Sequence, residues 1–305
     1  MPHISMMISL WVRAVRAPFF TASIVPVLFA AAFTLWTRQS VLWYLLPPLI
    51  LSVVFLHAGT NTINDYYDFK KGVDKKTTLG SSRVLVDGLM TPRQILVGSY
   101  VCFAAGFVIG LIPVVVRGIP VLILGILGLI GGYTYSGKPL GLKYSGLGEF
   151  VVFICMGPLL VMSTYYVLTG GYSAQTLYAS IPLGLLVTAI LHANNMRDSV
   201  SDRASGIQTF TTLIGFRAAK IEYYIFLIGA YLGVGVMSIL KIFPPQSLAV
   251  FFTLPLAVKN MRVISCAKQE KITVLADMDI RTARLHLLFG LVCIISFCIG
   301  AFKKN

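Results

Sequence analysis

Long apolar runs dominate the chain, and short polar breaks separate them into nine segments. Each run is close to the length of about 20 residues that an α-helix needs to cross roughly 30 Å of hydrocarbon. Proline and glycine inside several runs do not argue against helices, because neighbouring membrane helices satisfy the backbone groups that a kink frees. The pattern predicts nine transmembrane helices near residues 17–36, 42–63, 94–116, 119–136, 147–168, 176–195, 219–240, 246–263 and 283–302.

The composition supports a membrane protein. The 305 residues are 57% hydrophobic and only 12% charged, whereas soluble domains carry about 25% charged residues. So few charges cannot cover a water-soluble globule of this size. We therefore expect an all-α membrane protein in a lipid bilayer, with about nine transmembrane helices in one bundle.

The net charge of +14 reflects basic residues that gather in alternate loops. With the N-terminus inside, 20 of the 25 Lys and Arg residues fall on the cytoplasmic side, as the positive-inside rule requires. They form no basic face interleaved with aromatic residues, so no nucleic-acid partner is expected. The pattern predicts a multi-pass protein of the cell inner (cytoplasmic) membrane with its long polar loops in the cytoplasm.

Two dense clusters of carboxamides and carboxylates close the second and sixth predicted helices. Ionisable groups at membrane helices are costly and usually functional. Both clusters share the spacing Asn-x₂-Asn/Asp-x₃-Asp-x₃-Gly, whose first three positions lie on one face of a helix. The repeat predicts a single domain of two pseudo-repeated halves, about 1–140 and 141–305, with the active site at the cytoplasmic ends of the second and sixth helices. The matching residues, each pair offset by 134 positions, are Asn61, Asn64, Asp68 and Gly72 in the first cluster, and Asn195, Asp198, Asp202 and Gly206 in the second.

Oxygen-only side chains at helical spacing suit a hard cation such as Mg²⁺, which prefers carboxylates together with substrate phosphates. Nearby cations would neutralise a diphosphate between the two clusters. His57 and His192 lie just before the asparagines and are interpreted as structural or supporting residues. A cation-coupled transporter should instead place its carboxylates near mid-membrane, and that alternative stays open, as does an inactive lipid-binding scaffold. The candidate diphosphate-binding cations are Lys70, Lys71, Arg83, Lys138, Lys143 and Arg197.

The segments NDYYDFKKGVD and NNMRDSVSDRASGIQT resemble the paired aspartate motifs of the UbiA superfamily of intramembrane prenyltransferases. Residues 133–170 and 281–291 are similar to the branch that prenylates 1,4-dihydroxy-2-naphthoate for menaquinone. The resemblance implies Mg²⁺-dependent transfer of a polyprenyl chain from an allylic polyprenyl diphosphate to an aromatic small-molecule acceptor. Within the same fold, another quinone precursor or an isoprenoid glycerol phosphate is the alternative acceptor.

The resemblance, together with the spacing, assigns roles to individual residues. Asn64, Asp68, Asp198 and Asp202 are expected to be catalytic and to bind the metal. Gly72 occupies the place of a further aspartate in some branches, so the choice of Asp65 or Asp74 as an additional metal ligand stays open. Tyr133 and Lys138 resemble the family's tyrosine–lysine segment. The expected substrate-binding residues are Asn61, Lys70, Arg83, Lys138, Lys143, Asn195, Arg197 and Tyr133.

Overall fold

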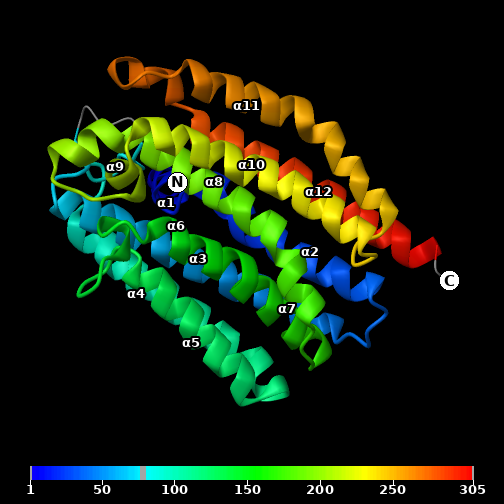
Figure 1. The fold of residues 1–305 in the computed structure, drawn as a ribbon. Helices are drawn as coiled ribbons and strands as arrows, with labels where there is room; N and C mark the ends of the chain where they lie inside the picture. The colour runs from blue at the N-terminus through cyan, green and yellow to red at the C-terminus, as the bar shows by residue number, and fades with distance from the viewer. Residues whose placement is uncertain (1, 76–79, 304–305) are drawn as a thin grey trace.

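The structure is a computed structural model that describes residues 2–75 and 80–303 (Figure 1). Across these residues the regular elements are helices, and no strand is present beyond one isolated parallel bridge between Ser145 and Gln208. The all-α prediction is therefore confirmed. The elements are α1 (Pro2–Ala14), η1 (Ala17–Phe20), α2 (Thr21–Trp36), η2 (Trp43–Leu45), α3 (Leu46–Lys70), α4 (Pro92–Arg117), α5 (Ile119–Thr134), η3 (Leu142–Tyr144), α6 (Gly148–Ile154), η4 (Cys155–Leu159), α7 (Leu160–Thr169), α8 (Ala174–Ala204), α9 (Phe210–Ile214), α10 (Phe216–Ile239), η5 (Pro245–Thr253), α11 (Leu254–Cys266), η6 (Gln269–Leu275) and α12 (Met278–Lys303).

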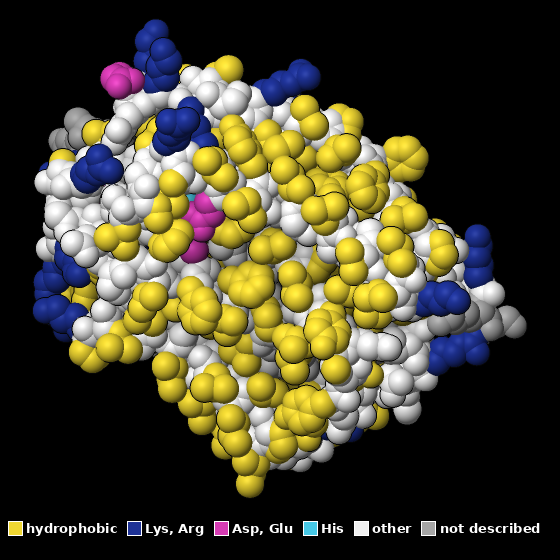
Figure 2. Space-filling model, in the orientation of Figure 1, with side chains coloured by type: hydrophobic (Ala, Val, Ile, Leu, Met, Phe, Trp, Pro, Cys, Tyr) yellow, Lys and Arg dark blue, Asp and Glu magenta, His cyan; other side chains and the backbone are white. Residues whose placement is uncertain are grey.

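Every predicted transmembrane segment is helical. Within the described residues, 8 helices are long and apolar enough to cross a membrane, and the predicted segment at 119–136 is the shorter apolar helix α5, with 16 residues. At 1.5 Å per residue α5 is about 24 Å long. Figure 2 shows hydrophobic side chains over the middle of the bundle and most Lys and Arg side chains towards its two ends. This distribution matches a protein that spans a bilayer.

The matching Asn and Asp residues of the two polar clusters are themselves helical and lie within the last turns of α3 and α8. α3 extends to Lys70 and α8 to Ala204, each beyond the end of its predicted apolar run. Both helices then close in the same way, with Gly72 at φ 69° and Gly206 at φ 70°. These left-handed conformations suit glycine, because it lacks a Cβ atom. In Figure 1 both helices run towards the end of the bundle where α9 lies.

One side of the bundle is closely packed, and the other side contains a cavity. The main apolar core lies among α2, α7, α8, α10 and α12, where the rings of Phe29, Phe33 and Phe297 meet edge to face. Such aromatic pairs add to the free energy of burial. α3, α4 and α5 lie on the other side of α8, as Figure 1 shows. A cavity lies between these helices and the segment α6–η4–α7.

The segment from Gly148 to Thr169 is not one regular helix. Its middle, η4, is a π-turn that contains Pro158, whose ring nitrogen has no hydrogen to donate. A Cβ on Gly157 would lie only 2.9 Å from the Cα of Gly184, so the two glycines let this segment approach α8 closely. Cys155, Met156 and Leu159 of the π-turn line the cavity. The wider turn thus shapes the cavity wall.

Candidate active site

A small polar pocket lies where α3 and α8 end, and both sequence motifs contribute to it. The Ser205 hydroxyl donates to the backbone carbonyl of Gly72 at 3.3 Å, which ties the two helix ends together directly. The predicted residues on this pocket come from both clusters and from the middle loop. The lining residues are Arg16, Asp68, Val73, Asp74, Gly80, Lys143, Asn194, Asn195, Asp198, Ser201 and Asp202.

At the end of α3, Lys143 organises the first motif. Its Nζ lies 2.6 Å from Asp68 Oδ2 and 3.1 Å from Asn64 Oδ1. Tyr144 donates its hydroxyl to Asp68 Oδ1 at 2.8 Å, and Asn64 Nδ2 donates to Asp68 Oδ2 at 3.0 Å. Burial lowers the pKa of Lys143, but Asp68 and other nearby groups outweigh burial and raise it overall. Lys143 therefore stays an ammonium although its side chain is buried.

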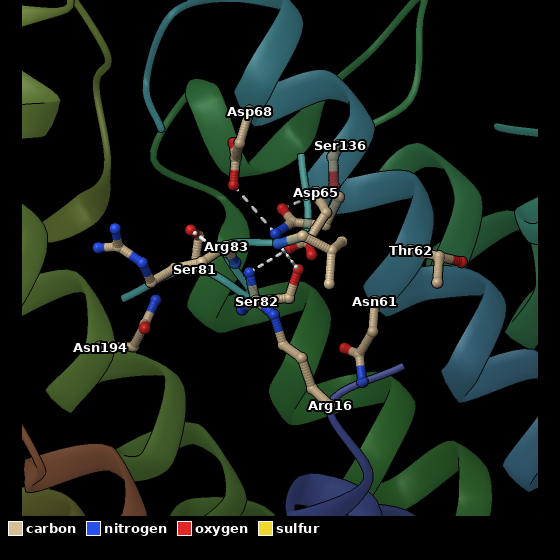
Figure 3. Close-up of polar contacts among 12 residues, drawn as sticks. Arg16, Asn61, Thr62, Asp65, Asp68, Ser81, Ser82, Arg83, Ser136 and Asn194 are labelled. Carbon is tan, nitrogen blue, oxygen red and sulfur yellow. Dashed lines mark hydrogen bonds and ion pairs between the residues drawn. The ribbon is translucent and has the colours of Figure 1, made fainter. Parts of the chain in front are cut away.

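Arg16 belongs to this site although it lies outside both motifs. It sits between α1 and η1 in a left-handed conformation, φ 53°, and Figure 3 shows its side chain pointing towards Asp65 and Ser82. Its Nη2 pairs with Asp65 Oδ1, while its buried Nε has no hydrogen-bond partner among the described residues. Burial lowers the pKa of Arg16, but Asp65 and Asp74 raise it overall. In the sequence, Arg16 is only one of the 20 basic residues on the predicted cytoplasmic side.

At the end of α8, Arg197 is bound by its own neighbours. Its Nε and Nη2 donate to the two carboxylate oxygens of Asp198 at 3.0 and 2.9 Å. Other donors of the same guanidinium bind Asn194 and Asp279 of α12. Asn195 donates to Glu149 Oε1 at 2.8 Å. The second motif is therefore fixed by contacts within its own half of the chain.

An apolar cavity of about 280 Å³ adjoins the polar pocket. Residues of α3, α4, α5, α6, α7 and α8 line it, and most of its walls are aliphatic. Arg16, Lys143 and Asn194 line both spaces. Tyr135 and Asn61 lie at the polar end of the cavity. A charged head and a long apolar tail of one molecule could therefore occupy neighbouring compartments.

Arg197 lines neither space within the described residues, although its partner Asp198 lines the polar pocket. Four further predicted binding residues lie elsewhere. Lys70 and Lys138 are exposed, and Arg83 pairs with Asp87 at 2.9 Å. The ring of Tyr133 packs against Phe103. None of the four appears among the described residues that line the two spaces.

The structure separates Asp65 from Asp74, the two carboxylates between which the sequence could not choose. Asp74 lines the polar pocket, whereas Asp65 lines neither space within the described chain. Asp65 follows Asn64 directly, so it points to a different face of α3 and meets Arg16. Burial and then the charge of Asp68 raise the pKa of Asp74 to about 7.

The donor chemistry of the pocket fits Mg²⁺ only if a substrate completes the site. Its carboxylate and carboxamide oxygens are the ligands that Mg²⁺ prefers. Across residues 2–75 and 80–303, however, no three Asp, Glu, His or Cys side chains converge on one metal position. Mg²⁺ commonly uses one or two carboxylates, several waters and substrate phosphates. The pocket is therefore suited to a metal that arrives together with a phosphorylated ligand.

Comparisons with known proteins agree with this geometry. The pattern of the UbiA prenyltransferase family matches residues 23–280. UbiA prenyltransferase domain-containing protein 1 from Homo sapiens is 34% identical over 287 residues, which cover 92% of this chain and 81% of the relative. The 1,4-dihydroxy-2-naphthoate octaprenyltransferase of Bacillus subtilis is 28% identical over 295 residues, covering 96% and 93%.

A solved structure shares the fold. The structure of a UbiA homolog from Archaeoglobus fulgidus bound to GPP and Mg²⁺ superposes with a TM-score of 0.60 at 18% identity, over 94% of this chain and 99% of that one. At this identity the likeness speaks for the fold alone. The family match over most of the chain goes further, and it shows that this membrane protein belongs to the UbiA prenyltransferase family and is a prenyltransferase.

Proposed function

We propose that the enzyme transfers a polyprenyl chain from an allylic polyprenyl diphosphate to the ring of 1,4-dihydroxy-2-naphthoate, in menaquinone biosynthesis. The observation that carries the proposal is that the two spaces are neighbours: a polar pocket built by both motifs adjoins an apolar cavity, with Arg16, Lys143 and Asn194 on both. The diphosphate would lie in the first and the prenyl chain in the second. The similarity to the Bacillus subtilis naphthoate octaprenyltransferase supports this acceptor.

In the proposed reaction the protein itself does little covalent chemistry. The ammonium of Lys143 and the guanidinium of Arg16 would stabilise the negative charge that develops on the departing diphosphate as the allylic C–O bond breaks. The apolar cavity would keep water away from the cationic prenyl carbon until the electron-rich ring attacks it. The ring would then lose its carboxylate as CO₂, which restores its aromaticity, and the diphosphate leaves with Mg²⁺. Electrostatic stabilisation of this kind is usually the largest contribution to catalysis.

Asp68, Asp74, Asp198 and Asp202 would hold Mg²⁺, with Asn64 orienting Asp68. When bound, Mg²⁺ supplies further positive charge for the leaving diphosphate. The Archaeoglobus fulgidus homolog of the same fold, whose structure is bound to GPP and Mg²⁺, supports a divalent cation here. A cation-coupled transporter is less consistent with the site, because Asp68 and Asp202 lie in the last turns of α3 and α8, away from mid-membrane.

We further propose that the site faces the cytoplasm from the inner membrane, and that the chain is one domain of two related halves. The excess of Lys and Arg in the loops at the motif end supports this orientation. Single cysteines at the exposed positions Lys138 and Gln39, which lie in loops of opposite sides, test it in a background whose native cysteines are replaced. We expect a membrane-impermeant reagent outside intact cells to reach only position 39, and labelling at 138 would contradict the orientation.

Turnover by the purified protein tests the reaction. With an allylic diphosphate and 1,4-dihydroxy-2-naphthoate, we expect prenylated product and released diphosphate in the presence of Mg²⁺, and neither after chelation. Parallel reactions offer 4-hydroxybenzoate and an isoprenoid glycerol phosphate as acceptors. Product from one of these but not from the naphthoate would replace the proposed acceptor.

The quinone content of cells that lack the gene is an independent readout. Loss of menaquinone, restored by the wild-type gene but not by a variant with Asp68→Asn, is the expected result. Persistence of menaquinone in the deletion strain would contradict the naphthoate as acceptor.

A further inference from the structure

His57 is a polar residue of the apolar cavity to which the proposed function gives no role. It lies on α3 and is buried, yet its ring lines the cavity. His57, Asn61, Asn64 and Asp68 follow each other at intervals of four, three and four residues, so they share one face of the helix. This stripe runs from the polar pocket into the apolar cavity, with His57 at its apolar end. At 1.5 Å per residue, His57 lies about 10 Å along the axis from Asn64.

The hydrogen bonds around His57 define which ring nitrogen carries the hydrogen. The Ser23 hydroxyl donates to the backbone carbonyl of Phe20 at 3.1 Å, and the same oxygen lies 3.0 Å from His57 Nδ1. A serine hydroxyl has one hydrogen to donate. Both bonds can therefore form together only if His57 Nδ1–H donates to Ser23. In the neutral ring, Nε2 is then left with a lone pair and no hydrogen.

Nε2 of His57 is left as an available acceptor on a residue that lines the cavity. No described residue makes a hydrogen bond to it, although the ring packs edge-on against Phe20 at 5.4 Å. His286 provides a contrast, because both of its nitrogens are fully enclosed without a partner among the described residues. His57 Nε2 is not enclosed in this way, and the space beside its ring is the cavity. An acceptor nitrogen in an apolar cavity calls for a ligand that carries a hydrogen-bond donor.

We infer that His57 binds the aromatic acceptor by accepting a hydrogen bond from a ring hydroxyl at Nε2. The inference rests on the proposed function, since a prenyl chain offers no donor whereas a dihydroxylated aromatic acceptor does. The reacting ring carbon must lie beside the first prenyl carbon, close to Asn64 and Lys143. A hydroxyl on the far side of the ring then points along α3 towards His57. This contact selects acceptors with a free hydroxyl at that position and orients the ring for attack.

The test compares 1,4-dihydroxy-2-naphthoate with its two monomethyl ethers, using one allylic diphosphate and Mg²⁺. Methylation keeps the oxygen on the ring but removes its hydrogen. The wild type should prefer the free hydroxyl over one of the two ethers by about tenfold or more in kcat/KM, the size of one hydrogen bond made in a buried site. Because the preference is a ratio measured on one preparation, the fraction of folded enzyme does not affect it.

Two substitutions separate recognition from packing. His57→Asn places its amide near Nδ1, so it keeps the contact with Ser23 but removes the acceptor at Nε2. His57→Gln places its amide near Nε2 and loses the contact with Ser23. The inference predicts that the Asn variant loses the hydroxyl preference, with KM for the allylic diphosphate unchanged, while the Gln variant keeps much of it. A purely structural histidine would give the opposite order of activity and an unchanged preference in both.

His286→Asn is the matched control, because His286 is also buried but does not line the cavity within the described chain. It should keep the wild-type preference whatever its stability. A wild-type preference retained in His57→Asn would overturn the inference and leave the proposed function standing. A wild type that prenylates no hydroxylated aromatic would instead overturn the proposed function itself.

Discussion

The ends of α3 and α8 share one spacing and one closing turn, but their charges are arranged differently. In both, a backbone N–H five residues beyond the last motif aspartate bonds that aspartate's carbonyl at 2.9 Å, from Val73 to Asp68 and from Ile207 to Asp202. The first end faces cations from distant segments, since Lys143 comes from the loop after α5. The second end uses a cation of its own helix, Arg197, which α12 also binds through Asp279.

This difference suggests that the two similar helix ends have different roles in binding the diphosphate. Arg16 and Lys143 line both the polar pocket and the apolar cavity, so a diphosphate between the two could contact them. Arg197 is engaged by two carboxylates and does not line either space within the described residues. We infer that the first end supplies both carboxylate and cations, whereas the second supplies mainly carboxylates. Substitutions at the two ends test this asymmetry.

The largest effects are expected at the shared carboxylates. Asp68→Asn and Asp202→Asn should each lower kcat by about 10²- to 10³-fold, because each removes a charge that would hold Mg²⁺ against the diphosphate. Release of diphosphate from an allylic substrate at saturating acceptor measures this. Full activity in either variant would mean that the corresponding helix end lies outside the site.

Substitutions of the two buried cations should have different effects on activity and stability. Lys143→Met should lower kcat by about 10²-fold in the folded enzyme, because it removes a charge that stabilises the leaving diphosphate. Arg197→Met should act mainly on stability, by roughly 3 kcal/mol, because it leaves the buried Asp279 and the half-buried Asp198 without their cation. Thermal unfolding in detergent and kcat per folded enzyme separate the two. A larger loss of kcat in the Arg197 variant would reverse the proposed asymmetry.

A bulky side chain inside the cavity should act on chain length alone. A Cβ at Gly125 meets nothing within 4 Å, and this glycine lines the cavity. Gly125→Phe has open space at its Cβ and should lower kcat/KM for long allylic diphosphates by about tenfold, while short ones are used as before. Gly235 of α10 has the same free space but does not line the cavity in the described chain. Gly235→Phe should leave the length preference unchanged, and a shift in both variants would exclude an effect of the cavity.

The smallest effect is expected at Arg83. It pairs with Asp87 at an exposed site, and exposed ion pairs contribute little. Arg83→Ala should keep kcat and KM for the allylic diphosphate within about twofold of the wild type. A large rise in KM for the diphosphate would restore the role that its position in the sequence suggested.

The helices and the matching turns that end the two motifs could be predicted because each depends on a local pattern. Apolar runs near 20 residues can only be satisfied in a bilayer as helices. Gly72 and Gly206 closed the repeated spacing in the sequence, and both adopt the left-handed conformation that makes equivalent turns. The pseudo-repeat of the two whole halves stays a prediction.

Contacts between distant segments could not be predicted in this way. Arg16 reaches the site from the start of the chain, and nothing in its local sequence distinguishes it from other basic residues near a membrane. Tyr135 lines the cavity while Tyr133 does not, because residues two positions apart at the end of α5 point to different faces. The pairing of Asp65 with Arg16 likewise depends on a contact across 49 residues. Such choices follow from packing, which the hydropathy pattern does not encode.

A double-mutant cycle on Asp68 and Asp202 tests most directly whether α3 and α8 build one diphosphate site. The cycle measures kcat/KM for an allylic diphosphate in the wild type, in Asp68→Asn, in Asp202→Asn and in the double variant. Groups that act as one unit give strongly non-additive losses. The kcat/KM of the double variant should therefore stay within about tenfold of that of the less active single variant. A double variant whose loss equals the product of the two single losses would show that the helix ends act independently, and would contradict a shared site.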